Sequence, residues 1–177
     1  MTDMTMQRND RASTLSDAIR GVRGRYDRLT GGQTAPIRRS RTSSDVALER
    51  AFWRVAGALG REEKYLSQVV LLFPLAAHAT RERFSFGGYL RVQLGDGDGP
   101  ALRFRRLLDS RDRDELEHRL RGILKLASHD RVPVDWGVLG VDILWFFAGS
   151  DSVRRRWAQD FYAPSRAETL KDAISVP

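Results

Sequence analysis

Histidine is the residue type best suited to acid–base or metal chemistry, and this chain has three: His78, His118 and His129. His118 stands among charged residues on the polar side of an amphipathic segment, which is typical of a solvated side chain. His78 and His129 have no second histidine three or four residues away, the spacing that places two such metal ligands on one face of a helix. We therefore predict no metal ion and no cofactor.

Other sequence patterns that could support catalysis are incomplete. The doublet His129-Asp130 could belong to a metal-dependent phosphohydrolase, but no second histidine lies near it. The segment Gly95–Pro100 carries acidic residues where a phosphate-binding loop needs bare amides, and it is too short for a calcium loop. With no cysteine there is no thiolate nucleophile and no disulfide bond. The sequence predicts a protein that is not an enzyme.

Net charge is the strongest signal in the composition. Thirty basic residues outnumber twenty-three acidic ones, which gives a net charge of +7 and a pI near 10.5. Only three of the basic residues are Lys, so twenty-seven are Arg. Because the planar guanidinium group can bind a phosphate through two parallel hydrogen bonds, this composition favours a nucleic-acid partner. The alternative is a solvated basic surface without a polyanionic ligand.

The basic residues occur in five clusters, which favour a surface that follows a nucleic-acid backbone. For any one cluster, a solvated helix face with ion pairs such as Glu117–Arg121 is the alternative. Trp53 and Trp157 lie beside or on apolar stripes, so we expect them to pack in the core. The clusters are Arg20, Arg23, Arg25 and Arg28; Arg38, Arg39 and Arg41; Arg103, Arg105 and Arg106; Arg119 and Arg121; Arg154, Arg155 and Arg156.

Apolar residues recur at spacings of three and four through most of the chain, which predicts helices and almost no strand. After one helix that ends near Thr30, we expect a loop over 32–40. Next we expect a helix that starts behind Ser43 or Ser44 and buries Leu48 and Phe52. Pro74 should kink or end the following apolar helix. Two later helices are predicted to have N-caps, the first a capping box of Asp112 with Glu115 and the second Asp135.

The run of alternating Gly and Asp before Pro100 has the composition of a linker. The predicted fold is therefore all-α, with two small helical bundles joined by a Gly/Asp-rich linker. The predicted division is a disordered lead-in over 1–11, an N-terminal helical domain over 12–95, a linker over 96–100, a C-terminal helical domain over 101–163 and a loosely held tail over 164–177. No apolar run reaches the roughly 20 residues that span a membrane. We expect a cytoplasmic protein without membrane contact.

Several of these segments, in this order, resemble the CasB family, the small subunit of the type I-E CRISPR surveillance complex Cascade. The resemblance extends over residues 20 to 163, and the chain departs from the family by a longer loop at Ser128 to Arg131. The matching segments are Gly32-Gln33-Thr34-Ala35-Pro36-Ile37-Arg38-Arg39, Gly87-Gly88-Tyr89-Leu90, Leu102-Arg103-Phe104-Arg105-Arg106-Leu107-Leu108, Val134-Asp135-Trp136 and Arg155-Arg156-Trp157-Ala158-Gln159-Asp160-Phe161-Tyr162.

The resemblance implies an all-helical subunit without catalytic activity that sits as two copies in the complex beside the other Cascade subunits. It further implies contacts with the guide RNA–target heteroduplex and with the displaced DNA strand. The basic positions that match the family are Arg38, Arg39, Arg103 and Arg121, with Arg106, Arg61 and Lys64 as further candidates.

Two other functions compete with nucleic-acid binding by such a subunit. In the first, the protein is a pure scaffold whose basic clusters dock on acidic patches of neighbouring proteins. In the second, it is a helix-turn-helix regulator. The sequence argues against this function, because no pair of helices joined by a three- or four-residue turn precedes an Arg-rich helix.

Overall fold

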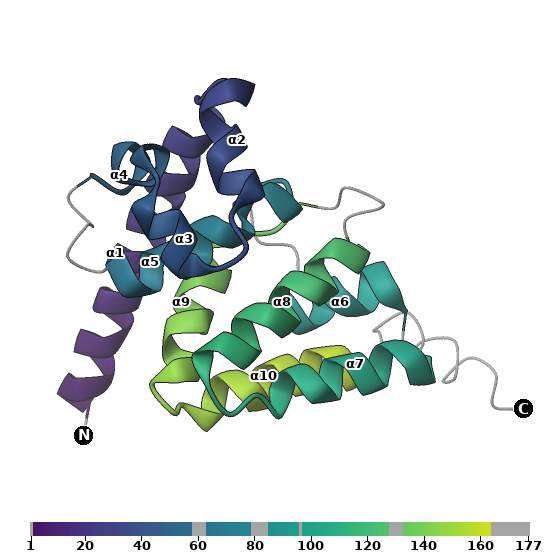
Figure 1. Cartoon of the computed structure of the whole chain (residues 1–177). Coiled ribbons are helices and arrows are strands. Elements are labelled where there is room, and N and C mark those ends of the chain that lie inside the picture. Colours follow the sequence, from purple (N-terminus) through teal and green to yellow (C-terminus); the bar gives the residue numbers. More distant parts are fainter. Residues whose placement is uncertain (1, 58–62, 79–84, 96, 128–132, 164–177) are drawn as a thin grey trace, which may run out of the picture.

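The computed structural model describes residues 2–57, 63–78, 85–95, 97–127 and 133–163. Within these ranges the chain is helical and has no strand, although one isolated parallel bridge joins His78 to Val134. The predicted all-α fold is confirmed (Figure 1). The helices are α1 (Thr2–Asp27), α2 (Gly31–Arg39), α3 (Ser43–Leu48), α4 (Arg50–Ala56), α5 (Glu63–Leu72), the 3-10 helix η2 (Phe73–Leu75), α6 (Phe86–Leu94), α7 (Asp98–Leu108), α8 (Arg113–Ala127), α9 (Trp136–Phe147) and α10 (Asp151–Tyr162).

Helix α1 buries the apolar face that its spacing predicts, since Ile19, Val22 and Tyr26 are 2%, 0% and 7% exposed. It begins earlier than the apolar spacing indicated, at Thr2. No Gly or Pro interrupts the chain before Gly21. Once a helix is nucleated, each further residue adds a hydrogen bond at small cost, and polar residues can therefore extend it.

Helix α2 occupies the segment that we expected to be a loop over 32–40. Its start is fixed by a capping box, in which the Thr30 side chain accepts from the amide of Gln33 and the Gln33 side chain accepts from the amide of Thr30. The two glycines after Thr30 stand in the first turn of the new helix and do not lengthen the loop. A Thr followed three residues later by a Gln is the sequence signature of a capping box and could have predicted this helix. The two glycines between them favoured a loop instead.

The helix expected after Ser43 is divided into α3 and α4 by the extended backbone of Glu49 (φ −84°, ψ 131°). Its N-cap is Thr42, not Ser43 or Ser44. The break turns Leu48 outward, where it is 87% exposed, so its predicted place in the core is wrong. Trp53 is also 46% exposed, and its indole N–H donates to the carbonyl of Ala47 at 2.8 Å.

The middle helices end at the residues that backbone chemistry predicts. Helix α5 passes into η2 at Phe73, immediately before Pro74, which lacks an amide proton for a further helical bond. Helix α6 is capped by the Ser85 hydroxyl and ends at Gly95, whose φ of 75° is costly for any residue with a Cβ.

Helices α7 and α8 form an adjacent pair in the second half of the chain. Gly97 is the N-cap of α7, so residues 98–100 of the predicted linker belong to its first turn. At the start of α8 the Asp112 carboxylate accepts from the amide of Glu115 at 2.8 Å, as predicted. The return bond to Glu115 comes from the amide of Arg111, one residue before the predicted donor.

Packing crosses the predicted boundary at 96–100. Helix α1 packs against α9 and α6 packs against α10, and buried apolar residues from both halves form one core. Figure 1 shows α9 between a group formed by α1 to α5 and a group formed by α6, α7, α8 and α10. The two helices α6 and α10 approach closely at Gly87, where an added Cβ would lie 2.1 Å from the carbonyl oxygen of Trp157. The Gly/Asp segment therefore does not separate the packing into two parts.

Candidate nucleic-acid interface

The basic cluster on α1 is largely occupied inside the protein. Arg23 is 6% exposed and donates to Asp27 and to the carbonyls of Phe73 and Ala76, the latter two at 3.0 and 2.9 Å. Arg25 donates to the carbonyl of Val55 at 2.6 Å, at the end of α4. These two side chains hold helices together and are not open to a nucleic-acid backbone, whereas Arg28 is exposed.

Arg20 also stabilises the fold, because its Nε and Nη2 donate to the two carboxylate oxygens of Asp135 at 3.1 and 2.7 Å. The hydrogen bond from Arg20 to Asp135 is the main reason why the pKa of Arg20 is raised, against the opposing effect of burial. Burial disfavours ionisation of Asp135, but the hydrogen bonds from Arg20 and from the amides of Val138 and Gly137 outweigh it and lower its pKa. Asp135 is therefore an anionic N-cap of α9, as the sequence predicted, and ties that helix to α1.

The cluster on α10 is partly occupied in the same way. Arg154 lies over the ring of Phe146, 4.5 Å from its centroid, and donates to the carbonyl of Ser110 at 3.2 Å. Arg156 pairs with the buried Asp142, which also accepts from the indole of Trp157 at 2.7 Å. Trp157 is fully buried, which confirms its predicted place in the core. Arg155 alone in this cluster is exposed without such a contact within the described residues.

Four of the predicted site residues present open guanidinium groups. Arg38 and Arg39 are exposed at the end of α2, and Arg103 and Arg106 are exposed on α7. Among the described residues, Arg39, Arg103 and Arg106 make no side-chain hydrogen bond or ion pair, and Arg38 makes one long bond, 3.3 Å, to the carbonyl of Gly31. These four side chains can bind a ligand without giving up a contact that the fold needs.

Arg121 differs from these four because it is half-buried and engaged. Its Nη1 donates to the main-chain carbonyl of Arg41 at 2.5 Å, across 80 positions of sequence. One turn earlier on α8, Glu117 accepts from the amide of Ser43 at 3.0 Å and does not pair with Arg121 as the solvated-face alternative supposed. Arg121 therefore both adds positive charge and anchors the loop that follows α2.

The anchoring places α8 between the two helices that carry the predicted groups of arginines. The loop after α2 lies against α8, and α8 packs against α7 (Figure 1). Arg41 is exposed and adds positive charge to this surface. The sequence around Arg41 did not indicate that its main-chain carbonyl would accept a hydrogen bond from α8. Arg61 lies outside the described residues, and so does the side chain of Lys64, although its backbone belongs to α5.

Within the part of the chain that the structure describes, no three His, Cys, Asp or Glu side chains gather as a metal site. His129 and Asp130 lie outside those ranges. No described helix combines the length and the apolar character that crossing a bilayer requires. Over the described residues the geometry defines a helical protein in which the open arginines among the predicted site residues lie on α2 and α7, with α8 between these helices (Figure 1).

Comparison with known proteins identifies the family. The family model of the CRISPR-associated protein Cse2 matches residues 11–162, so the chain belongs to that family. The crystal structure of CasB from M. ruber is similar in fold, with a TM-score of 0.65 and 22% identity over 90% of this chain and 97% of that one. No curated protein sequence matches the chain. The resemblance to the small subunit of type I-E Cascade that the sequence suggested is confirmed.

Proposed function

We propose that this Cascade subunit grips nucleic-acid backbone in the cytoplasm, stabilising the guide RNA–target heteroduplex and the displaced DNA strand. Its partners in this role are the guide RNA, the target DNA strands, the other Cascade subunits and a second copy of itself. Arg38, Arg39, Arg103 and Arg106 make the contacts in this proposal, and Arg121 contributes charge beside the loop that it anchors.

One observation carries the proposal. Where arginines stabilise this fold, as Arg20, Arg23 and Arg25 do, their donors point at carboxylates or carbonyls of the same chain. Arg38, Arg39, Arg103 and Arg106 leave most of their donors open to solvent instead. A protein that retains open, planar donors on two helices that flank a third is suited to an anionic ligand with repeated phosphates.

The energetics of strand exchange favour such a surface. Replacing a DNA duplex by an RNA–DNA heteroduplex is nearly balanced in free energy, so sequence-independent backbone contacts can decide whether the opened state persists. Phosphates carry no sequence information, and the guide RNA supplies the specificity. The subunit needs no nucleophile, general base or metal for this role, and we propose that it has no catalytic activity.

The test is binding of the isolated full chain to mixed-sequence single-stranded and double-stranded DNA at several salt concentrations. We expect weak binding without sequence preference that falls steeply as salt rises, because each phosphate contact releases counterions. The double variant R103A/R106A is then placed in the assembled complex, where we expect impaired retention of the opened target and normal assembly. Normal DNA binding with failed assembly would instead support the scaffold function.

A further inference from the structure

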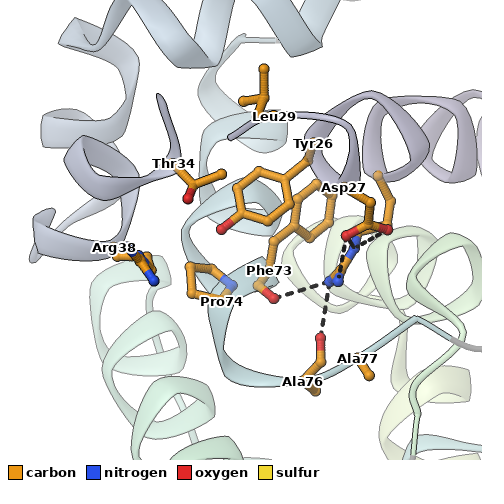
Figure 2. Close-up of a pocket in the computed structure, with 10 residues that line it drawn as sticks. Tyr26, Asp27, Leu29, Thr34, Arg38, Phe73, Pro74, Ala76 and Ala77 are labelled. Atoms are coloured by element: carbon orange, nitrogen blue, oxygen red, sulfur yellow. Dashed lines mark hydrogen bonds and ion pairs between the residues drawn. The ribbon is translucent and has the colours of Figure 1, made fainter. Parts of the chain in front are cut away.

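A hollow of about 360 Å³ lies between α1, α2 and η2, beside the arginines at the end of α2. Its lining includes Tyr26 and Asp27 of α1, Thr34 and Arg38 of α2, and Pro74 of η2. Figure 2 shows these side chains around the opening, with Arg38 on one side and the Asp27 carboxylate on the other. Two chemical features of this hollow are not explained by the fold.

The first feature is the hydroxyl group of Tyr26. Tyr26 is 7% exposed, and its ring packs edge-on against Phe73 with centroids 5.4 Å apart. Figure 2 shows the hydroxyl end of the ring turned toward Pro74 and Arg38, and no described residue forms a hydrogen bond with it. Burial raises the pKa of Tyr26, so the hydroxyl keeps its proton and is a donor at neutral pH.

The second feature is Arg38 of α2, which lines the same hollow as Tyr26 (Figure 2). Burial raises the pKa of Tyr26, and the positive charges of Arg23 and, to a smaller extent, Arg38 work against that effect. One N–H of Arg38 donates to the carbonyl of Gly31 at 3.3 Å, and its other donors are open. The hollow therefore contains two donors from different helices that face one space.

The carboxylate in the hollow, that of Asp27, is already paired. Arg23 donates to both carboxylate oxygens of Asp27 at 2.9 and 3.0 Å and to the carbonyls of Phe73 and Ala76. The Thr34 hydroxyl donates to the carbonyl of Gly31 at 3.1 Å. Because Arg23 neutralises Asp27, the positive charge of Arg38 is left unbalanced. This arrangement suits an anion with several acceptor oxygens and disfavours a cation.

We infer that the hollow is a phosphate subsite, in which the Tyr26 hydroxyl and the Arg38 guanidinium donate to the oxygens of one phosphate group. The inference rests on the proposed function where that phosphate belongs to a nucleic-acid strand held by the neighbouring arginines. A free phosphate compound would meet the same two donors, and the experiment below separates the two sources.

The test uses the full chain labelled with 15N and titrated separately with inorganic phosphate and with a mixed-sequence single-stranded 12-mer. Chemical shifts of the Tyr26, Thr34 and Ala76 amides report the hollow, and those of α7 report the exposed arginines. Y26F removes the hydroxyl and keeps the ring. We expect it to weaken binding at the hollow by about threefold to tenfold, the effect of one lost hydrogen bond. Y89F is the matched control, because Tyr89 is equally buried, with a pKa raised by burial to about 12, but lies on α6.

Each outcome decides the inference. Shifts in the hollow with both ligands, weakened by Y26F and unchanged by Y89F, support a subsite for the strand. Shifts in the hollow with phosphate alone support a subsite for free phosphate compounds and count against a strand in the hollow. If neither ligand shifts the hollow signals while the 12-mer still shifts those of α7, or if Y26F binds as the wild type does with an unchanged Tm, the subsite is overturned while the proposed function stands.

Discussion

The Glu117 carboxylate on α8 accepts a hydrogen bond from the main-chain amide of Ser43 at 3.0 Å, across 74 positions of sequence. Glu117 is 8% exposed, so this bond forms where water competes little. Ser43 is the first residue of α3, and its amide is one of those that no carbonyl within the helix can satisfy. The bond fixes the start of α3, and with it the loop that carries Arg41, against α8.

Replacing Glu117 by Ala should therefore destabilise the protein. The Ser43 amide would lose its partner in a region that is largely closed to water, which costs about 1–3 kcal/mol of unfolding free energy. Urea denaturation measures this change, and hydrogen exchange should show faster exchange at Ser43. His118→Ala is the control, because His118 is the exposed neighbour on the same helix and should change stability by less than about 0.5 kcal/mol. Equal stabilities for the two variants would contradict the role of Glu117.

Asp135→Asn should reduce stability at neutral pH and make it less sensitive to acid. Asparagine can still cap α9, so the variant removes mainly the charge that Arg20 contacts, at a cost of about 1–3 kcal/mol. The pKa of Asp135 is lowered in the folded state, so its contribution is present above the ordinary aspartate pKa of about 4 and is lost as pH falls through the folded pKa. Unfolding free energies measured from pH 7 to pH 3 should converge for wild type and variant at acid pH. A constant difference would show that the charge is not responsible.

Two glycine substitutions should have opposite effects on stability. In Gly87→Ala the new Cβ would lie 2.1 Å from the carbonyl oxygen of Trp157, which forces α6 and α10 apart. Overpacking of this kind costs about 1–3 kcal/mol or more. Gly122→Ala on α8 meets nothing within 4 Å and should stabilise the protein by about 0.5–1 kcal/mol, because alanine favours the helix. Thermal melts of both variants give the comparison, and a stabilised Gly87→Ala protein would show that the contact between these helices is looser than the structure has it.

The double variant R103A/R106A should weaken DNA binding without weakening the fold. If each arginine contacts one phosphate, the plot of log K against log salt on single strands should become shallower by about 1.4, at roughly 0.7 for each contact. R50A/R54A removes the same charge from exposed positions on α4 and controls for net charge. A shift of equal size in both variants would show that binding reflects overall charge and no defined surface.

Periodicity predicted the helices well because most of them bury one apolar face. Ile19, Val22 and Trp157 are buried where their spacing placed them. The errors fall where local backbone chemistry overrides that pattern. The capping box of Thr30 turned an expected loop into α2, and the extended backbone of Glu49 turned Leu48 out of the core.

The candidate site was only partly visible in the sequence. A count of clustered arginines cannot separate those that bind carbonyls of the same chain, such as Arg23 and Arg25, from those that stay open, such as Arg103. That distinction depends on partners many positions away in the chain. Arg121 shows the same difficulty, because its contact with the carbonyl of Arg41 spans 80 positions and leaves no local signal.

The packing of α1 on α9 and of α6 on α10 bears on how the protein unfolds. Each half of the chain supplies helices that complete the core of the other, so neither half can melt while the other stays intact. Unfolding should be a single cooperative transition, with fluorescence and circular dichroism giving the same midpoint. Cleavage of the peptide chain between 95 and 97 would for the same reason leave two fragments that remain associated, each serving as the template on which the other folds.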